Sequence, residues 1–163
     1  CTNADEASLA LRGSRTADVR LRRHAESALA VARWLQGHPR VGQVLHPALP
    51  ASPGHELWKR DFSGSNGLLA FELLEPAGAP ATPVAAAAVA DALARDGLFG
   101  LGYSWGGFES LVMPGVLPNG TTHQPRRVRG WSGGALLRLH IGLEPVESLL
   151  RSLEVALRAT ATT

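Results

Sequence analysis

The segment ALLRLHIGL, residues 135–143, alternates in the manner of a β-strand with two different faces. One face is entirely apolar and consists of Ala135, Leu137, Leu139 and Ile141. The other face carries Leu136, Arg138, His140 and Gly142. Burying a guanidinium on such a strand is unfavourable unless an anion meets it. The pattern therefore predicts that Arg138 binds a carboxylate or phosphate ligand, or else that it forms an internal ion pair. His140 is expected to be a hydrogen-bonded structural residue rather than a catalytic one.

Outward from this strand, periodicity and turn residues predict the other elements. An amphipathic stripe predicts a helix, which Gly37 as a left-handed cap and Pro39 should end; the stripe consists of Leu21, Ala25, Ala28, Ala32 and Leu35. Thr82 and Pro83 should begin a second helix that stops near Gly97, and residue 145 should open a third. Strands are expected at 41–45 and within 67–74, 98–103 and 110–113, with irregular chain over 48–67 and 114–134. This order indicates an α/β fold with a mixed or antiparallel sheet covered by helices.

The composition narrows the class of protein. With 163 residues, 45% of them hydrophobic, one domain is the default. No run of about 18 apolar residues occurs, so we expect no membrane partner. The chain begins at Cys1, its only cysteine, without a signal pattern or an initiator Met. We interpret it as a processed chain or a fragment from a reducing, cytoplasmic setting without disulfides.

The charged residues point away from nucleic acid. The net charge is only +2, and fifteen of the sixteen basic residues are arginines. Small clusters occur at 20–23 and 126–129, but neither carries interleaved aromatics or a nucleic-acid-binding module. The only lysine, Lys59, lies in the charged string WKRD, where we expect an exposed loop and no activated amine.

The segment LFGLGYSWGGFESLVMP, residues 98–114, places Tyr103, Ser104 and Trp105 directly before Gly106 and Gly107. Hydroxyl and indole donors beside glycines suit a loop that faces a ligand. A glycine-rich bend packed under an aromatic lid explains the same letters equally well, and the spacing leaves both open.

Nucleotide-binding and metal-binding motifs are absent from the sequence. It contains no GxGxxG or P-loop pattern; the letters at 102–106 (GYSWG) and 130–134 (GWSGG) match GxSxG, but we expect no nucleophile elbow and no catalytic triad. The spacing of His38, His46, His55 and Glu56 matches no standard metal site, so we predict that no metal is bound.

Five segments in register nevertheless resemble the cystathionine β-lyase family of pyridoxal-phosphate enzymes. They are LALRGSRTADVRLRRHAESALAVARWL (9–35), VLHPALP (44–50), GHELWKRDFSGSNGLLAFEL (54–73), the 98–114 segment and ALLRLHIGLEPVESLLRSLE (135–154). Trp105 and the pair Met113–Pro114 resemble the β-lyase branch more than the γ-lyases and γ-synthases. The resemblance corresponds to the C-terminal part of the family's polypeptide, which has the aspartate-aminotransferase-like fold. Residues 1–37 would then be a long connecting helix, and residues 38–163 the small α/β domain.

The resemblance implies an activity and a site. The activity is β-elimination of cystathionine, or a related thioether amino acid, to homocysteine, pyruvate and ammonia in methionine biosynthesis and transsulfuration. Arg138 would clamp the substrate α-carboxylate, assisted by the Ser104 backbone and the Trp105 indole nitrogen, and Tyr103 would line the pocket.

The family's cofactor lysine, pyridine-pairing Asp, ring-stacking Tyr and phosphate loop belong to the preceding domain. We therefore expect neither catalytic nor cofactor-binding residues here, and an isolated chain that is inactive. The partners would be an N-terminal pyridoxal-phosphate domain and further subunits of a homotetramer. The alternative is a free-standing, non-catalytic domain that binds a small amino acid or carboxylate, or a partner subunit.

Overall fold

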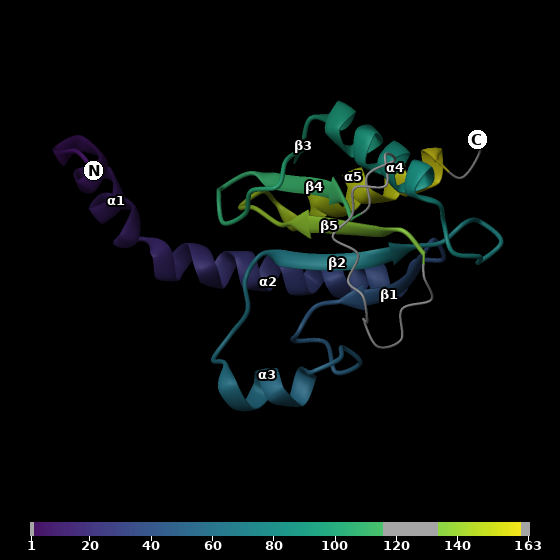
Figure 1. Ribbon diagram of the computed structural model, residues 1–163, viewed down its shortest axis with the longest axis horizontal. Coiled ribbons are helices and arrows are strands. Elements are labelled where there is room, and N and C mark those ends of the chain that lie inside the picture. Colours follow the sequence, from purple (N-terminus) through teal and green to yellow (C-terminus); the bar gives the residue numbers. More distant parts are fainter. Residues whose placement is uncertain (1, 116–133, 161–163) are drawn as a thin grey trace.

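A five-stranded sheet organises the molecule (Figure 1). The computed structural model describes residues 2–115 and 134–160. Its elements, in chain order, are α1 Ala4–Ser14, α2 Ala17–Gln36, β1 Val41–Leu45, α3 His55–Asp61, β2 Leu68–Leu73, α4 Pro83–Asp96, β3 Phe99–Leu101, β4 Ser110–Pro114, β5 Leu136–His140 and α5 Val146–Ala159. Every predicted strand is present, and all lie within the predicted ranges except β4, which extends by one residue, Pro114, beyond its predicted end.

The sheet is mixed, with the strand order β1-β2-β5-β4-β3. The β3–β4 pair is parallel and the other three pairs are antiparallel. β5 occupies the centre, where Arg138 lies opposite Ala70 of β2 on one side and Met113 of β4 on the other. The predicted α/β class with a mixed sheet covered by helices is confirmed.

One hydrophobic core joins the sheet to α2, α4 and α5. In the view of Figure 1, α2 and α5 pass behind the strands, and α4 lies above them. The four residues predicted for the apolar face of the central strand are at most 4% exposed and belong to this core: Ala135, Leu137, Leu139 and Ile141. The alternation of β5 therefore decides which face of the sheet the helices cover.

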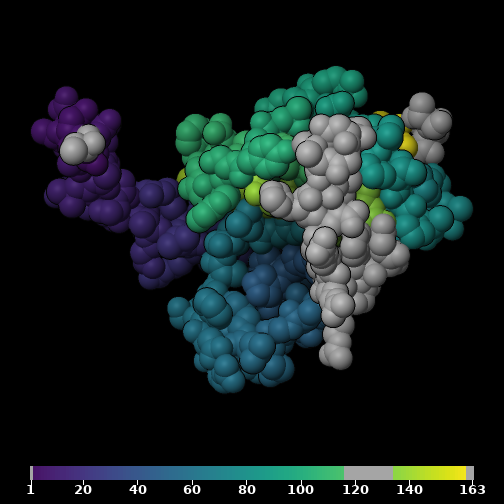
Figure 2. Space-filling view, viewed as in Figure 1, coloured from purple at the N-terminus to yellow at the C-terminus, as the bar shows by residue number. Residues whose placement is uncertain are grey.

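The expected connecting helix over 1–37 is divided into α1 and α2. The break follows Gly13, a residue that weakens helix interiors, whose carbonyl accepts a hydrogen bond from the Arg15 backbone. α1 buries no residue and stands clear of the body of the protein (Figure 2). In α2, Ala28, Ala32 and Leu35 are buried as predicted, but the predicted Leu21 is 52% exposed. The buried stripe of α2 begins only where the helix reaches the sheet.

The predicted ends of α4 and α2 are confirmed, but the left-handed conformation expected at the end of α2 is wrong. The Thr82 side chain accepts a hydrogen bond from the Ala85 backbone, and Gly97 ends α4 in the left-handed region with φ 81°. Gly37, expected to be left-handed as well, has φ −92°. Its N–H donates to the Trp34 carbonyl, so the end of α2 needs no special backbone conformation there.

α3 was not predicted, because residues 48–67 were expected to be irregular. It has seven residues, none of them buried, so no apolar periodicity marks it. Gly54 at its N-terminus adopts φ 83°, a conformation that favours glycine. The indole N–H of Trp58 donates to the Gly64 carbonyl and ties the helix to the chain that follows. Lys59 therefore lies on an exposed helix and not in a loop.

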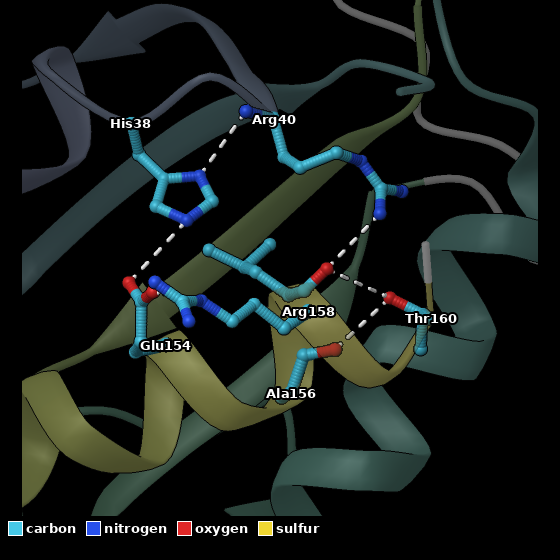
Figure 3. A network of polar contacts seen from close by, with 7 residues as sticks. His38, Arg40, Glu154, Ala156, Arg158 and Thr160 are labelled. Carbon is cyan, nitrogen blue, oxygen red and sulfur yellow. Dashed lines mark hydrogen bonds and ion pairs between the residues drawn. The ribbon is translucent and has the colours of Figure 1, made fainter. Parts of the chain in front are cut away.

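A buried arginine fixes the end of the sheet at which β1 begins (Figure 3). Arg40 is 5% exposed; its Nε donates to the Leu74 carbonyl after β2, and its Nη1 donates to the Leu157 carbonyl in the last turn of α5. Beside it, Glu154 pairs with Arg158 and lies 3.5 Å from the His38 Nε2 atom. This Arg40 network joins the start of β1 to the backbone at the ends of β2 and α5.

In the part of the chain that the structure describes, no helix is long and apolar enough to cross a membrane.

Candidate functional site

Arg138 points from the centre of β5 to the loop over 102–109, which joins β3 to β4. Its Nη2 lies within hydrogen-bonding distance of three backbone carbonyls, those of Gly102 (3.2 Å), Tyr103 (2.7 Å) and Ser104 (3.2 Å). Among residues 2–115 and 134–160, no carboxylate pairs with Arg138, and its buried Nε has no partner. The internal ion pair, one of the two explanations of this arginine, is thus not found there. The guanidinium therefore has a buried donor that no group among these residues uses.

The loop presents its aromatic side chains to the surface. Tyr103 is 65% exposed and Trp105 is 61% exposed. Gly106 has φ 83°, so the turn itself requires glycine. A side chain at Gly106 or Gly107 would meet no atom within 4 Å, and the described structure gives no close backbone approach as a reason for either. The explanation by an aromatic lid packed over a bend does not fit rings this exposed.

His140, two residues after Arg138 on β5, holds the other half of the same loop. The Gly106 N–H and the Gly107 carbonyl each lie 3.1 Å from its Nε2. The ring is buried, and this burial lowers the pKa of His140, although the Gly107 carbonyl acts in the opposite direction. His140 is hydrogen-bonded, as expected, but its partners are in the candidate site.

A carboxylate anchors the far end of the loop. Glu144 accepts hydrogen bonds from the Ser110 backbone (2.7 Å) and from the Ser110 hydroxyl (2.8 Å), and that hydroxyl accepts a bond from the Gly142 N–H (2.8 Å). A Cβ at Gly142 would lie 2.3 Å from the Phe108 carbonyl oxygen, so this position requires glycine. Sequence analysis missed this anchor, whose only local signal is a glycine and an acid just after a strand.

A small cavity of about 260 Å³ opens beside the loop. Its walls include Trp105, Gly106 and His140 from the site, and Arg20 and His24 from α2. The cavity, the exposed Trp105 ring and His140 thus lie together at the end of β5, and Arg138, two residues earlier on that strand, contacts the same loop without lining the cavity.

The chain belongs to the Cys/Met metabolism PLP-dependent enzyme family. The model of that family matches residues 1–158. Cystathionine β-lyase of Bordetella avium is 49% identical over 98% of this chain and 37% of its own length, and the Escherichia coli K12 enzyme is 45% identical over 93% and 36%. Cystathionine γ-lyase of the mouse is 36% identical over 93% of this chain and 36% of its own length.

Solved structures agree with this membership. A cystathionine γ-synthase of Xanthomonas oryzae superposes with a TM-score of 0.74 at 38% identity, over 95% of this chain and 38% of that one. An O-acetylhomoserine sulfhydrylase of Wolinella succinogenes gives 0.72 at 27% identity, over 94% and 38%. The chain therefore has the fold of these enzymes but spans little more than a third of their length.

Pyridoxal phosphate is the cofactor of the family, but the residues of this chain do not fit it. The cofactor's aldehyde needs a lysine amine, and the only lysine, Lys59, is exposed on α3, an element that buries no side chain. The site formed by β5 and the loop contains an arginine and histidines but no amine.

The remaining candidates lie elsewhere. His46 is buried after β1, and His55 on α3 lies 2.8 Å from the Pro47 carbonyl. Within the described ranges no three His, Cys, Asp or Glu side chains are grouped as metal ligands. Arg126, Arg127 and Arg129, the second basic cluster, fall outside the described residues.

Proposed function

We propose that this chain is the C-terminal, substrate-binding part of a pyridoxal-phosphate-dependent carbon–sulfur lyase of the cystathionine β-lyase type. The observation that carries the proposal is the geometry of Arg138. A guanidinium is always charged and carries five N–H donors, so it is suited to hold a carboxylate while it also donates to backbone carbonyls. Arg138 forms no ion pair within residues 2–115 and 134–160, its buried Nε has no hydrogen-bond partner there, and the loop that its Nη2 contacts borders a cavity.

In the proposed complex the α-carboxylate of the substrate accepts hydrogen bonds from Arg138. The loop carbonyls of residues 102–104 already hold the guanidinium at one nitrogen, so little side-chain entropy is lost when the anion arrives. The Trp105 indole N–H and the Ser104 backbone provide further donors to the same carboxylate, and Tyr103 lines the pocket. These residues bind and orient; none of them catalyses.

The placement of the chain within the longer polypeptide rests on what its residues lack. The family's cofactor lysine and phosphate-binding loop belong to the domain that precedes the substrate-binding part, and neither occurs here. Residues 1–37 are proposed as the connection between the two parts, and residues 38–163 as the small domain. The exposed Tyr103, Trp105 and Phe108 side chains suit a surface that the cofactor domain covers.

The proposed reaction is β-elimination. Cystathionine and one water give homocysteine, pyruvate and ammonia, with cleavage of the bond between sulfur and the β-carbon. The 45–49% identity to cystathionine β-lyases supports this reaction over γ-elimination. Assembly into a homotetramer and a cytoplasmic location remain predictions.

The test is to identify the keto acid that the native gene product forms from L-cystathionine. We expect pyruvate, because the β-carbon bond breaks. Formation of 2-oxobutyrate would show cleavage at the γ-carbon and would overturn the β-lyase assignment. The isolated 163-residue chain, mixed with pyridoxal phosphate, should give no stable absorbance band of a lysine adduct; a band that disappears in Lys59→Ala would overturn the proposed division of labour.

A further inference from the structure

We propose that His140 is the positioning residue of the substrate-binding loop, which it holds at the glycine pair while Arg138 holds the preceding carbonyls. This inference rests on the proposed function. Both side chains come from the same face of β5, two residues apart, and together they contact residues 102–104 and 106–107 of the loop. Ser104 and Trp105 belong to this part of the loop, so the positions of these two residues depend on the contacts of Arg138 and on those of His140.

The His140 ring has little freedom to move. It is 1% exposed, and the buried His24 ring of α2 lies 5.2 Å from it, centroid to centroid. His24 is itself fixed by a 2.7 Å contact between its Nδ1 and the Ile141 carbonyl. On another side, a Cβ at Gly67 would lie 2.8 Å from the Nδ1 and Cε1 atoms of His140. Because the surrounding atoms leave the His140 ring little room to move, the loop residues hydrogen-bonded to the ring are held in place as well.

The two contacts at the His140 Nε2 have opposite requirements. The Gly106 N–H needs a lone pair on that nitrogen, whereas the Gly107 carbonyl needs a proton there. One nitrogen satisfies only one of them at a time: a neutral ring with its proton on Nδ1 holds the Gly106 N–H, whereas a ring protonated at Nε2, neutral or charged, holds the Gly107 carbonyl. The charged or titratable groups that face the ring are His24 and Arg20 of α2, Arg138 of β5 and Glu144 after it. With the neutral ring, the Gly106 N–H can be held and the Trp105 peptide is fixed.

The experiment measures kcat and KM for L-cystathionine in the native gene product carrying His140→Leu, His140→Gln or His46→Leu. Leucine fills the space without hydrogen bonds, and a displaced loop should raise KM about tenfold while kcat changes by less than about twofold. Glutamine places an amide at the position of Nε2 and should restore KM to within about threefold of wild type. His46→Leu is the matched control, because His46 is an equally buried histidine that bonds a backbone N–H (Ala48) away from the site.

The outcomes separate the inference from the proposed function. If His140→Leu lowers the thermal midpoint as His46→Leu does but leaves KM unchanged, His140 is only structural and the inference is wrong. An unchanged KM in Arg138→Gln would instead refute the proposed carboxylate site, whatever His140 does. A pH profile adds a readout that a packing role would not move: the wild-type KM should rise as the imidazole becomes protonated, and that rise should disappear in His140→Gln. A rise that persists in the variant would overturn the tautomer argument.

Discussion

Arg40 and Arg138 are both arginines that donate to backbone carbonyls, yet they do different work. Arg40 is 5% exposed and bonds the ends of regular elements, at Leu74 after β2 and Leu157 in α5. Arg138 is half-buried and bonds three successive carbonyls of a loop through a single nitrogen. The comparison shows that a guanidinium stabilises the fold when the carbonyls it contacts belong to helices and strands. When those carbonyls belong to a surface loop, we expect the guanidinium to be able to bind a ligand as well.

The largest expected effect is on stability, at Arg40. Arg40→Leu removes the donors of two backbone carbonyls and should lower the free energy of unfolding by about 3 kcal/mol, since each buried group left unsatisfied costs about 1–3 kcal/mol. Chemical denaturation measures this loss. Arg95→Gln, an exposed arginine on α4, is the control and should change the free energy by less than about 0.5 kcal/mol. Equal stability of the two variants would contradict the structural role of Arg40.

The next effect is on binding, at Arg138. Arg138→Gln removes a charge-assisted hydrogen-bond pair and should raise KM for L-cystathionine about thirtyfold, which corresponds to about 2 kcal/mol. Its unfolding free energy should fall by less than about 1 kcal/mol, because its present partners are loop carbonyls near solvent. Steady-state kinetics and denaturation of the same native gene product test both halves. A variant that unfolds easily but binds normally would reverse the comparison between the two arginines.

The smallest effect is the pH dependence of stability, to which both ends of the sheet contribute. Burial lowers the pKa of His38 beside Arg40, where Glu154 acts in the opposite direction, and burial also lowers the pKa of His140 beside Arg138. The unfolded chain, with an ordinary histidine pKa of about 6.5, therefore takes up protons first as the pH falls. Stability should be complete above about pH 6.5 and should decline below it. His38→Gln and His140→Gln should each flatten this decline in denaturant titrations at pH 5–7, and slopes identical to wild type would contradict it.

Local signals were sufficient for part of the fold. The alternation of β5 predicted the face that the core covers, and the Thr82 and Gly97 caps of α4 were predicted because a cap depends on a few neighbouring residues. Prediction failed for a short helix with no apolar pattern, and for a residue whose burial depends on tertiary packing. α3 is short and buries nothing, and the stripe of α2 includes Leu21, which lies where no sheet covers the helix.

The candidate site divides in the same way. The residue types at Arg138 and in the 103–107 segment could be singled out from their chemistry and from the resemblance to the family. The contacts between them could not, because β5 and the loop are separated by more than thirty residues along the chain. The same separation hid the anchor that Glu144 forms with Ser110.

The sequence by itself determined the alternating central strand and the caps of α4, because each depends only on neighbouring residues. It also determined the family, because the motifs occur in the order typical of that family. Only the tertiary structure decided that Arg40 closes the fold while Arg138 retains a spare donor, and that His140 holds the glycine pair. Those roles depend on which backbone carbonyls and amides come within about 3 Å of a side chain, the distance of a hydrogen bond. The pairing of strands in the sheet, and not the order of residues, brings these groups together.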